Sequence, residues 1–239
     1  MQSNIPIVII KQIGQLFTDF FSLIYPRICP GCNGSLVHGE QGLCTICKHE
    51  LSYTNFLDDP QNALASTFYG RLPLENVFSY IYFFKGGIAQ SILHELKYKG
   101  NYEIGVLMGE WFGRELRDKN FGWDVIVPVP LHPQKLKKRG YNQSEQFAKG
   151  LANILGISLK PDLLQRHLQS ETQTHKSKME RWENVKDNFS VTDTTYVKDR
   201  HVLLVDDVIT TGSTIEACGN VLLNSGVSKL SVIALAMAR

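Results

Sequence analysis

The residues best suited to chemistry lie near the C-terminus, in the segment HVLLVDDVITTGST at residues 201–214. Four apolar residues, typical of a buried strand, lead into the adjacent acids Asp206 and Asp207 and then into a loop of small residues. Such a loop, placed before a helix, presents unpaired backbone N–H groups that stabilise a phosphate. The acids would repel a phosphate but accept hydrogen bonds from sugar hydroxyls. A helix cap by Ser213 or Thr214 accounts for one hydroxyl and not for the acid pair, so the segment favours a phosphorylated sugar.

A second group of reactive side chains lies near the N-terminus, where four of the five cysteines form the pattern C-x2-C-x11-C-x2-C at Cys29, Cys32, Cys44 and Cys47. Two CxxC pairs offer four thiolates to a tetrahedral ion, which predicts a structural zinc site. A pair of disulfides is one alternative to zinc, but a reducing cytoplasm disfavours it. A thioredoxin-like redox site is another, but it would have a single CxxC at the start of a helix and not two such pairs. His38 and His49 are interpreted as surplus surface histidines, and Cys218 as a small core residue.

The elements that must position these residues alternate in type. Apolar strands are expected at 78–84, 124–130, 202–205 and 229–238, and helices at 88–97, 102–117, 142–156 and 213–226. Strands that alternate with helices predict an α/β fold with a mostly parallel sheet and helices on both faces. We expect two domains, an N-terminal helix with the zinc module at 1–55 and the α/β domain at 70–239.

The bulk composition excludes little. The chain has 239 residues, 43% of them hydrophobic and 20% charged, as in an ordinary soluble globular protein. A net charge of +2 indicates neither a nucleic-acid nor a membrane partner, although KLKKR at 135–139 is locally basic. Residues 9–24 have helical apolar spacing, interrupted by polar residues. They predict an amphipathic helix that packs on the protein, in preference to docking on a membrane surface, and not a signal peptide or a membrane span. We therefore expect a cytoplasmic protein.

The residues of the first motif carry a resemblance to a known family. VLLVDDVITTGST resembles the signature by which type I phosphoribosyltransferases bind phosphoribosyl pyrophosphate (PRPP). The resemblance implies that Asp206 and Asp207 bind the ribose 2′- and 3′-hydroxyls. It also implies that a run of five residues cradles the 5′-phosphate: Thr210, Thr211, Gly212, Ser213 and Thr214.

A narrower resemblance covers nearly the whole chain. VPVPLHPQKLKKRGYNQSEQFA at 127–148 and HELKYKG at 94–100 are similar to segments of the competence protein F (ComF) family, which also has a double CxxC module. A polar segment at 165–189 follows that family's pattern at Gln173, Thr174, Arg181, Asn184, Val185 and Phe189. The chain departs from the expected patterns at Ile209, where a tyrosine is common, and at Lys176, where a leucine is usual.

This family resemblance implies further roles. Residues 127–142 are expected to hold pyrophosphate, with Pro130, Arg139, Gly140, Tyr141 and Asn142 as the candidates and Mg²⁺ as the accompanying ion. The segment at 165–189 resembles a flexible hood, so Arg181 and Asn184 are candidates for catalysis, or alternatively only order this loop. Lys97 and Lys99 have a weaker claim to the same cleft.

Three functions remain open at this point. The first is a Mg²⁺-dependent phosphoribosyltransferase, which displaces pyrophosphate from the ribose C1 in favour of an unidentified acceptor. The second is a non-catalytic protein that binds PRPP or a related phosphosugar and assists natural transformation, with single-stranded DNA and a DNA-uptake helicase as partners. The third is a PRPP-responsive regulator.

Overall fold

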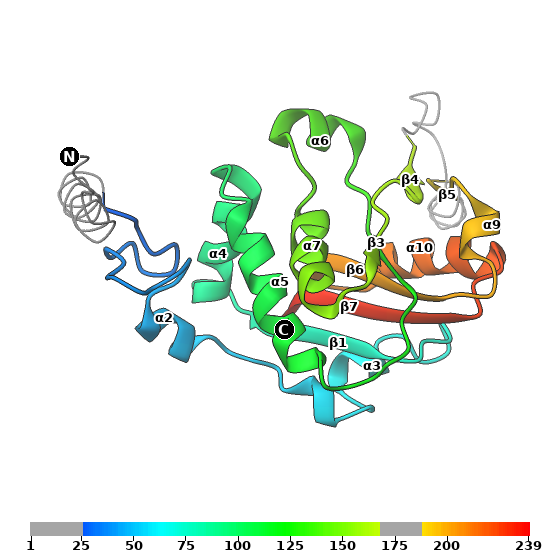
Figure 1. Ribbon diagram of the computed structural model, residues 1–239, viewed down its shortest axis with the longest axis horizontal. Coiled ribbons are helices and arrows are strands. Elements are labelled where there is room, and N and C mark those ends of the chain that lie inside the picture. The colour runs from blue at the N-terminus through cyan, green and yellow to red at the C-terminus, as the bar shows by residue number, and fades with distance from the viewer. Residues whose placement is uncertain (1–25, 168–187) are drawn as a thin grey trace, which may run out of the picture. The chain divides into compact units, whose positions relative to one another are not determined.

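The computed structural model describes residues 26–167 and 188–239 (Figure 1). Contacts divide the chain into two compact units, Met1–Glu50 and Leu51–Arg239. The amphipathic helix expected at residues 9–24 lies outside the described residues. Among the residues described, no helix is both long and apolar enough to cross a membrane.

The described part of the first unit is a small cysteine module. An isolated antiparallel bridge joins Ile28 to Ser35, and helix α2 (Thr45–Glu50) follows. Leu43 and Cys47 are buried, with 2% of each exposed. With so few apolar side chains to bury, a module of this size normally needs a metal or disulfides to hold its fold.

The second unit is built on a parallel sheet in the order β1-β7-β6-β2-β3. Its strands are β1 (Val77–Phe83), β2 (Val125–Pro128), β3 (Ser158–Leu159), β6 (His201–Ile209) and β7 (Lys229–Ala238). All four pairings are parallel. The first six residues of β6 and seven consecutive residues of β7 are buried, so both faces of the sheet are covered. The expected parallel α/β fold is confirmed.

Along the chain, pairs of helices follow β1 and β2, and single helices precede and follow β6 (Figure 1). The longer ones are α4 (Ile88–Tyr98), α5 (Glu103–Leu116), α7 (Gln143–Leu155) and α10 (Ser213–Asn224). Shorter ones are η1 (Phe56–Asp58), α3 (Ala63–Ser66), α6 (Pro133–Arg139) and α9 (Thr194–Val197). Helix α7 packs on β2 and β6, and α10 packs on β6 and β7.

Two glycines allow α5 and α7 to touch through their backbones. A Cβ added to Gly109 would lie 2.1 Å from the carbonyl oxygen of Phe147, and one added to Gly150 would lie 2.0 Å from that of Val106. Only glycine tolerates such an approach. Helix α5 therefore supports α7, the helix whose first turn reaches the candidate site.

The structure also differs from the sequence-based expectations in three places. The strand expected at 202–205 extends to Ile209, so the acid pair lies within β6. The basic segment 135–139, expected as part of a loop, forms α6, which His132 caps through its side chain. The segment expected as a loop at 165–189 begins and ends in an antiparallel ribbon of β4 (Leu164–Arg166) and β5 (Phe189–Val191).

Candidate functional site

The acid pair stands at the carboxyl end of β6, beside the end of β2. Asp206 is 8% exposed, and its Oδ1 accepts hydrogen bonds from the Ser144 hydroxyl at 2.9 Å and from the Asp207 N–H at 2.8 Å. Asp207 accepts the Val208 N–H on Oδ1 at 2.8 Å, and its Oδ2 lies 2.7 Å from the Lys97 Nζ. Ser144 belongs to α7 and Lys97 to α4, so three elements converge on two carboxylates.

The electrostatic environment separates the two acids. Burial raises the pKa of Asp206 to about 7, and the neighbouring Asp207 carboxylate adds to the rise. The Ser144 hydroxyl, the Asp207 N–H and the Lys97 ammonium act in the opposite direction without cancelling it. Asp206 therefore changes its charge near neutral pH, whereas Asp207 has a cation as its direct partner.

The five residues expected to cradle a phosphate form the turn from β6 into α10. Together with Asp206 and the end of β6, they line one small cavity. Thr210, Thr211, Ser213 and Thr214 are exposed. Gly212 precedes the first turn of α10 with φ of +76°, and an added Cβ there would lie 2.7 Å from the Phe68 ring. Glycine is thus required both by conformation and by space, and the first N–H groups of a 12-residue helix face this turn.

An arginine far away in sequence fixes this turn. Arg71 donates to the Thr211 carbonyl oxygen at 2.9 Å and forms an ion pair with Glu216 of α10 at 2.5 Å. Its guanidinium also lies over the Phe68 ring, 5.7 Å from the ring centroid. The sequence alone does not point to Arg71, because 140 residues separate it from Thr211 and no motif surrounds it.

The residues expected to hold pyrophosphate divide into two groups. Tyr141 donates its hydroxyl to the Leu96 carbonyl oxygen at 2.6 Å, and Asn142 donates to the Val129 carbonyl oxygen at 2.9 Å and caps α7. These two side chains fix the loop between β2 and α7. Gly140 ends α6 with φ of +84°, and Pro130 is half-buried near the end of β2.

Arg139 belongs instead to a basic cavity of about 300 Å³, lined by Lys97, Tyr98, Gly100, Lys135, Lys138 and Arg139. Its guanidinium lies 5.6 Å from the Tyr98 ring centroid and donates to the Gln143 side chain. Lys97 belongs both to this cavity and to the ion pair with Asp207. The cavity is therefore electrostatically suited to a multiply charged anion beside the acid pair. Arg181 and Asn184, the candidates from the hood segment, lie outside the described residues.

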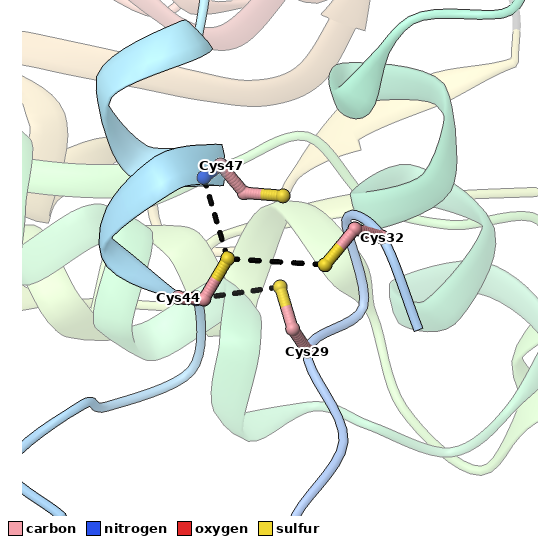
Figure 2. A group of neighbouring side chains, drawn as sticks. All are labelled: Cys29, Cys32, Cys44 and Cys47. Atoms are coloured by element: carbon pink, nitrogen blue, oxygen red, sulfur yellow. Dashed lines mark hydrogen bonds between the residues drawn. The ribbon is translucent and has the colours of Figure 1, made fainter. Parts of the chain in front are cut away.

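The four cysteines of the first unit converge, as Figure 2 shows. Their sulfur atoms all lie within 4.8 Å of one another. Backbone N–H groups point at three of the sulfurs: Gly34 N to Cys32 Sγ at 3.4 Å, Cys44 N to Cys29 Sγ at 3.3 Å and Cys47 N to Cys44 Sγ at 3.4 Å. Four sulfur donors at this separation fit a tetrahedral zinc ion. His38 and His49 are exposed and lie outside the group.

Backbone hydrogen bonds favour a thiolate at Cys29, whereas burial and the neighbouring cysteines raise the pKa of Cys47. Burial raises the pKa of Cys29, but the backbone N–H groups of Cys44, Cys32 and Gly31 outweigh it and lower the value to about 7. Glu40 orients the second CxxC pair, because its carboxylate accepts the Thr45 N–H at 2.7 Å and the Val37 N–H at 2.9 Å. The cysteine spacing does not point to Glu40, because this residue lies outside both CxxC pairs.

Comparison with known proteins decides the family. The phosphoribosyl transferase domain family matches residues 100–239, which include β2, β6 and the acid pair. The chain belongs to this family. The expected type I phosphoribosyltransferase-like fold, with a four-cysteine module in front of it, is confirmed.

Curated relatives narrow the assignment within the phosphoribosyl transferase family. The chain is 28% identical to the DNA utilization protein YhgH of Escherichia coli over 228 residues, which cover 88% of this chain and 96% of that protein. It is 36% identical to competence protein F of Haemophilus influenzae over 116 residues, covering 48% of this chain and 51% of the relative. It is 25% identical to competence protein ComFC of Bacillus subtilis, covering 84% and 79%. The resemblance to the ComF family is confirmed.

The chain is also similar to several solved structures. A glutamine PRPP amidotransferase from B. subtilis is 21% identical with a TM-score of 0.42, over 56% of this chain and 26% of that one. A purine phosphoribosyltransferase from Pyrococcus horikoshii is 24% identical with a TM-score of 0.35, over 56% and 74%.

Proposed function

We propose that the second unit binds PRPP and transfers its phosphoribosyl group, with Mg²⁺, to an acceptor not yet identified. One observation carries this proposal: the carboxylate pair and the N-terminal turn of α10 adjoin at the end of one strand, and Asp206 lines the same cavity as that turn. On this proposal, Asp206 and Asp207 accept hydrogen bonds from the two ribose hydroxyls. The five residues from Thr210 to Thr214 offer N–H and hydroxyl groups to the 5′-phosphate.

The proposed chemistry is displacement at the ribose C1. The bond from C1 to the pyrophosphate oxygen breaks, the pyrophosphate leaves with the bonding electrons, and the acceptor forms the new bond to C1. The bound Mg²⁺ supplies positive charge to the leaving pyrophosphate. The protein contributes positioning, because the sugar is held at both ends, and cationic charge from Lys97, Lys138 and Arg139 in the adjoining cavity. Arg181 and Asn184 remain candidates for closing over the sugar.

For the first unit we propose a structural zinc ion on Cys29, Cys32, Cys44 and Cys47. All four positions of a tetrahedral ion are then filled by protein, so the ion stabilises the fold and leaves no position for a substrate. Four thiols also require a reducing compartment, and we propose a cytoplasmic location on that ground.

The test of the proposed activity is pyrophosphate release from PRPP and Mg²⁺ in the presence of a panel of nucleobases, amines and single-stranded DNA. We expect release with one class of acceptor, and its loss in the double variant Asp206→Asn, Asp207→Asn. These substitutions keep size and remove charge. PRPP binding by calorimetry must weaken by at least about a hundredfold, since two charged hydrogen-bond acceptors are lost. A double variant that binds PRPP like the wild type would refute the assignment.

A second candidate function is non-catalytic handling of single-stranded DNA, together with a DNA-uptake helicase. The favouring observation is Tyr98, which is 71% exposed and lines a cavity together with four cationic side chains, because single strands bind to basic grooves with aromatic platforms. The curated relatives are named for DNA utilization and competence.

This second function predicts salt-dependent binding of single-stranded DNA. Charge reversal at Lys135 and Lys138 should weaken the binding, and the same change at Lys229, far along the chain and 55% exposed, should not. An absence of binding at low salt would exclude it. PRPP binding without any pyrophosphate release, combined with DNA binding, would favour it over the transferase.

A further inference from the structure

We propose that Lys97 makes the acid pair selective for ribose ligands that carry a pyrophosphate, and that it does so through its ion pair with Asp207. This inference rests on the proposed PRPP site and assigns a specificity-determining residue to it. Lys97 lies in the last turn of α4, about a hundred residues before Asp207, the acid with which it forms an ion pair.

The ion pair uses the oxygen that a sugar hydroxyl needs. Asp207 Oδ1 accepts the Val208 N–H at 2.8 Å, and Asp207 Oδ2 lies 2.7 Å from Lys97 Nζ. The side chains of Lys97 and Asp207 are only 25% and 17% exposed. A ribose hydroxyl that binds Asp207 must therefore share or displace an ammonium group, and loosening a partly buried ion pair is unfavourable unless another anion compensates the lysine.

The basic cavity supplies the place for that second anion. Lys97 lines it together with Lys135, Lys138 and Arg139. A pyrophosphate in this cavity gives the Lys97 ammonium a new negative partner while the ribose hydroxyl takes up Asp207. Ribose 5-phosphate brings no charge to the cavity, because its one phosphate belongs in the turn at Thr210 to Thr214. The ion pair of Lys97 and Asp207 thus disfavours ribose 5-phosphate but does not disfavour PRPP.

The two residues that flank Lys97 in the sequence make contacts that fix its position beside the cavity. The carbonyl oxygen of Leu96 accepts the Tyr141 hydroxyl at 2.6 Å, and the Tyr98 ring lies 5.6 Å from the Arg139 guanidinium. Both partners come from the segment that carries the other cations. The end of α4 is therefore fixed to the cavity wall, and Lys97 reaches from that wall to Asp207.

Lys99 provides a matched control two residues away. Lys99 directly follows α4; its Nζ forms an ion pair with Glu95 of that helix at 2.8 Å, and its side chain is 55% exposed. It is not among the residues that line the cavity. Both lysines belong to the KYK sequence, so their roles are separated by structure alone.

The experiment measures dissociation constants for PRPP and ribose 5-phosphate, each with Mg²⁺, in the wild type and in Lys97→Met, Lys97→Arg and Lys99→Met. In Lys97→Met, PRPP should bind about tenfold more weakly, because the variant loses a partly exposed ion pair between the ammonium group and the pyrophosphate. Ribose 5-phosphate should bind to this variant as well as to the wild type, or better. The preference for PRPP therefore falls by about tenfold or more. Lys97→Arg, which keeps the charge, and Lys99→Met should retain the preference within about twofold.

One outcome overturns the inference alone: an unchanged preference in Lys97→Met, whether both affinities stay as in the wild type or both weaken equally, as a merely structural role would require. A wild type that binds neither ligand overturns the proposed function and the inference with it. Lys97→Gln is measured in parallel, since a neutral polar side chain at this half-buried position protects against misfolding, and thermal unfolding of every variant verifies the fold.

Discussion

The cysteine module and the acid pair are two sites built in different ways. The module takes all four of its cysteines from 19 consecutive residues, Cys29 to Cys47. The acid pair takes its partners from α4, α7 and β6, so Lys97, Ser144 and Asp206 come together only when the sheet is complete. A local site is specified by spacing, whereas an assembled site depends on every contact that brings its elements together.

Zinc removal is the largest expected effect, and it separates the two sites. Cys44→Ser with Cys47→Ser should reduce bound zinc from about one ion per chain to none, as measured by elemental analysis. Structural zinc contributes on the order of 10 kcal/mol or more to small modules, so the first unit should unfold. PRPP binding should remain within about threefold of the wild type, because the acid pair belongs to the second unit. Cys218→Ser, outside the cluster, serves as the control for zinc content; retained zinc in the double variant would contradict the assignment.

Gly109→Ala tests the close contact between α5 and α7, the helix that brings Ser144 to the acid pair. The new methyl group would meet the Phe147 carbonyl oxygen of α7 at 2.1 Å, and backbone cannot move aside as a side chain can. We expect the free energy of unfolding, from urea titration, to fall by about 3 kcal/mol. Gly105→Ala, one turn earlier in α5, meets mainly the flexible Leu96 side chain at 2.9 Å and should be affected less. An equal loss of unfolding free energy in the two variants would show that the close approach of α5 and α7 does not limit the stability.

The same contrast explains what the sequence could predict. The cysteine spacing, the VDDVITTGST segment and the alternating strands and helices are local patterns, and the fold they predict is confirmed. The partners Lys97, Ser144 and Arg71 are distant in sequence from the groups they bind, and only the packing of α4, α7 and the segment before β1 brings them close. Helical spacing points Lys97 and Lys99 in different directions, but only the packing of α4 decides which of them meets Asp207.

Arg71→Met asks how far the phosphate turn depends on a distant residue. The substitution keeps an apolar stem over Phe68 but removes the donor to the Thr211 carbonyl oxygen and the ion pair with Glu216. Because the turn would lose its anchor, ribose 5-phosphate should bind about tenfold more weakly in calorimetry. Arg114→Met, which removes an exposed pair within α5, is the control and should leave the affinity unchanged. A wild-type affinity in Arg71→Met would mean that the turn is held by β6 and α10 alone.

The smallest expected effect is a pH dependence that belongs to the assembled site. Burial and the Asp207 charge raise the pKa of Asp206 to about 7, against the opposing Ser144 hydroxyl and Lys97 ammonium. Asp206 is therefore protonated below that pH and becomes an acceptor for a sugar hydroxyl above it. Ribose 5-phosphate binding should tighten by up to about tenfold from pH 6 to pH 8, as the ionised fraction of Asp206 rises from about 10% to about 90%. Asp206→Asn should retain only the dependence due to the ligand's own phosphate. An identical pH profile in that variant would assign the titration to a group other than Asp206.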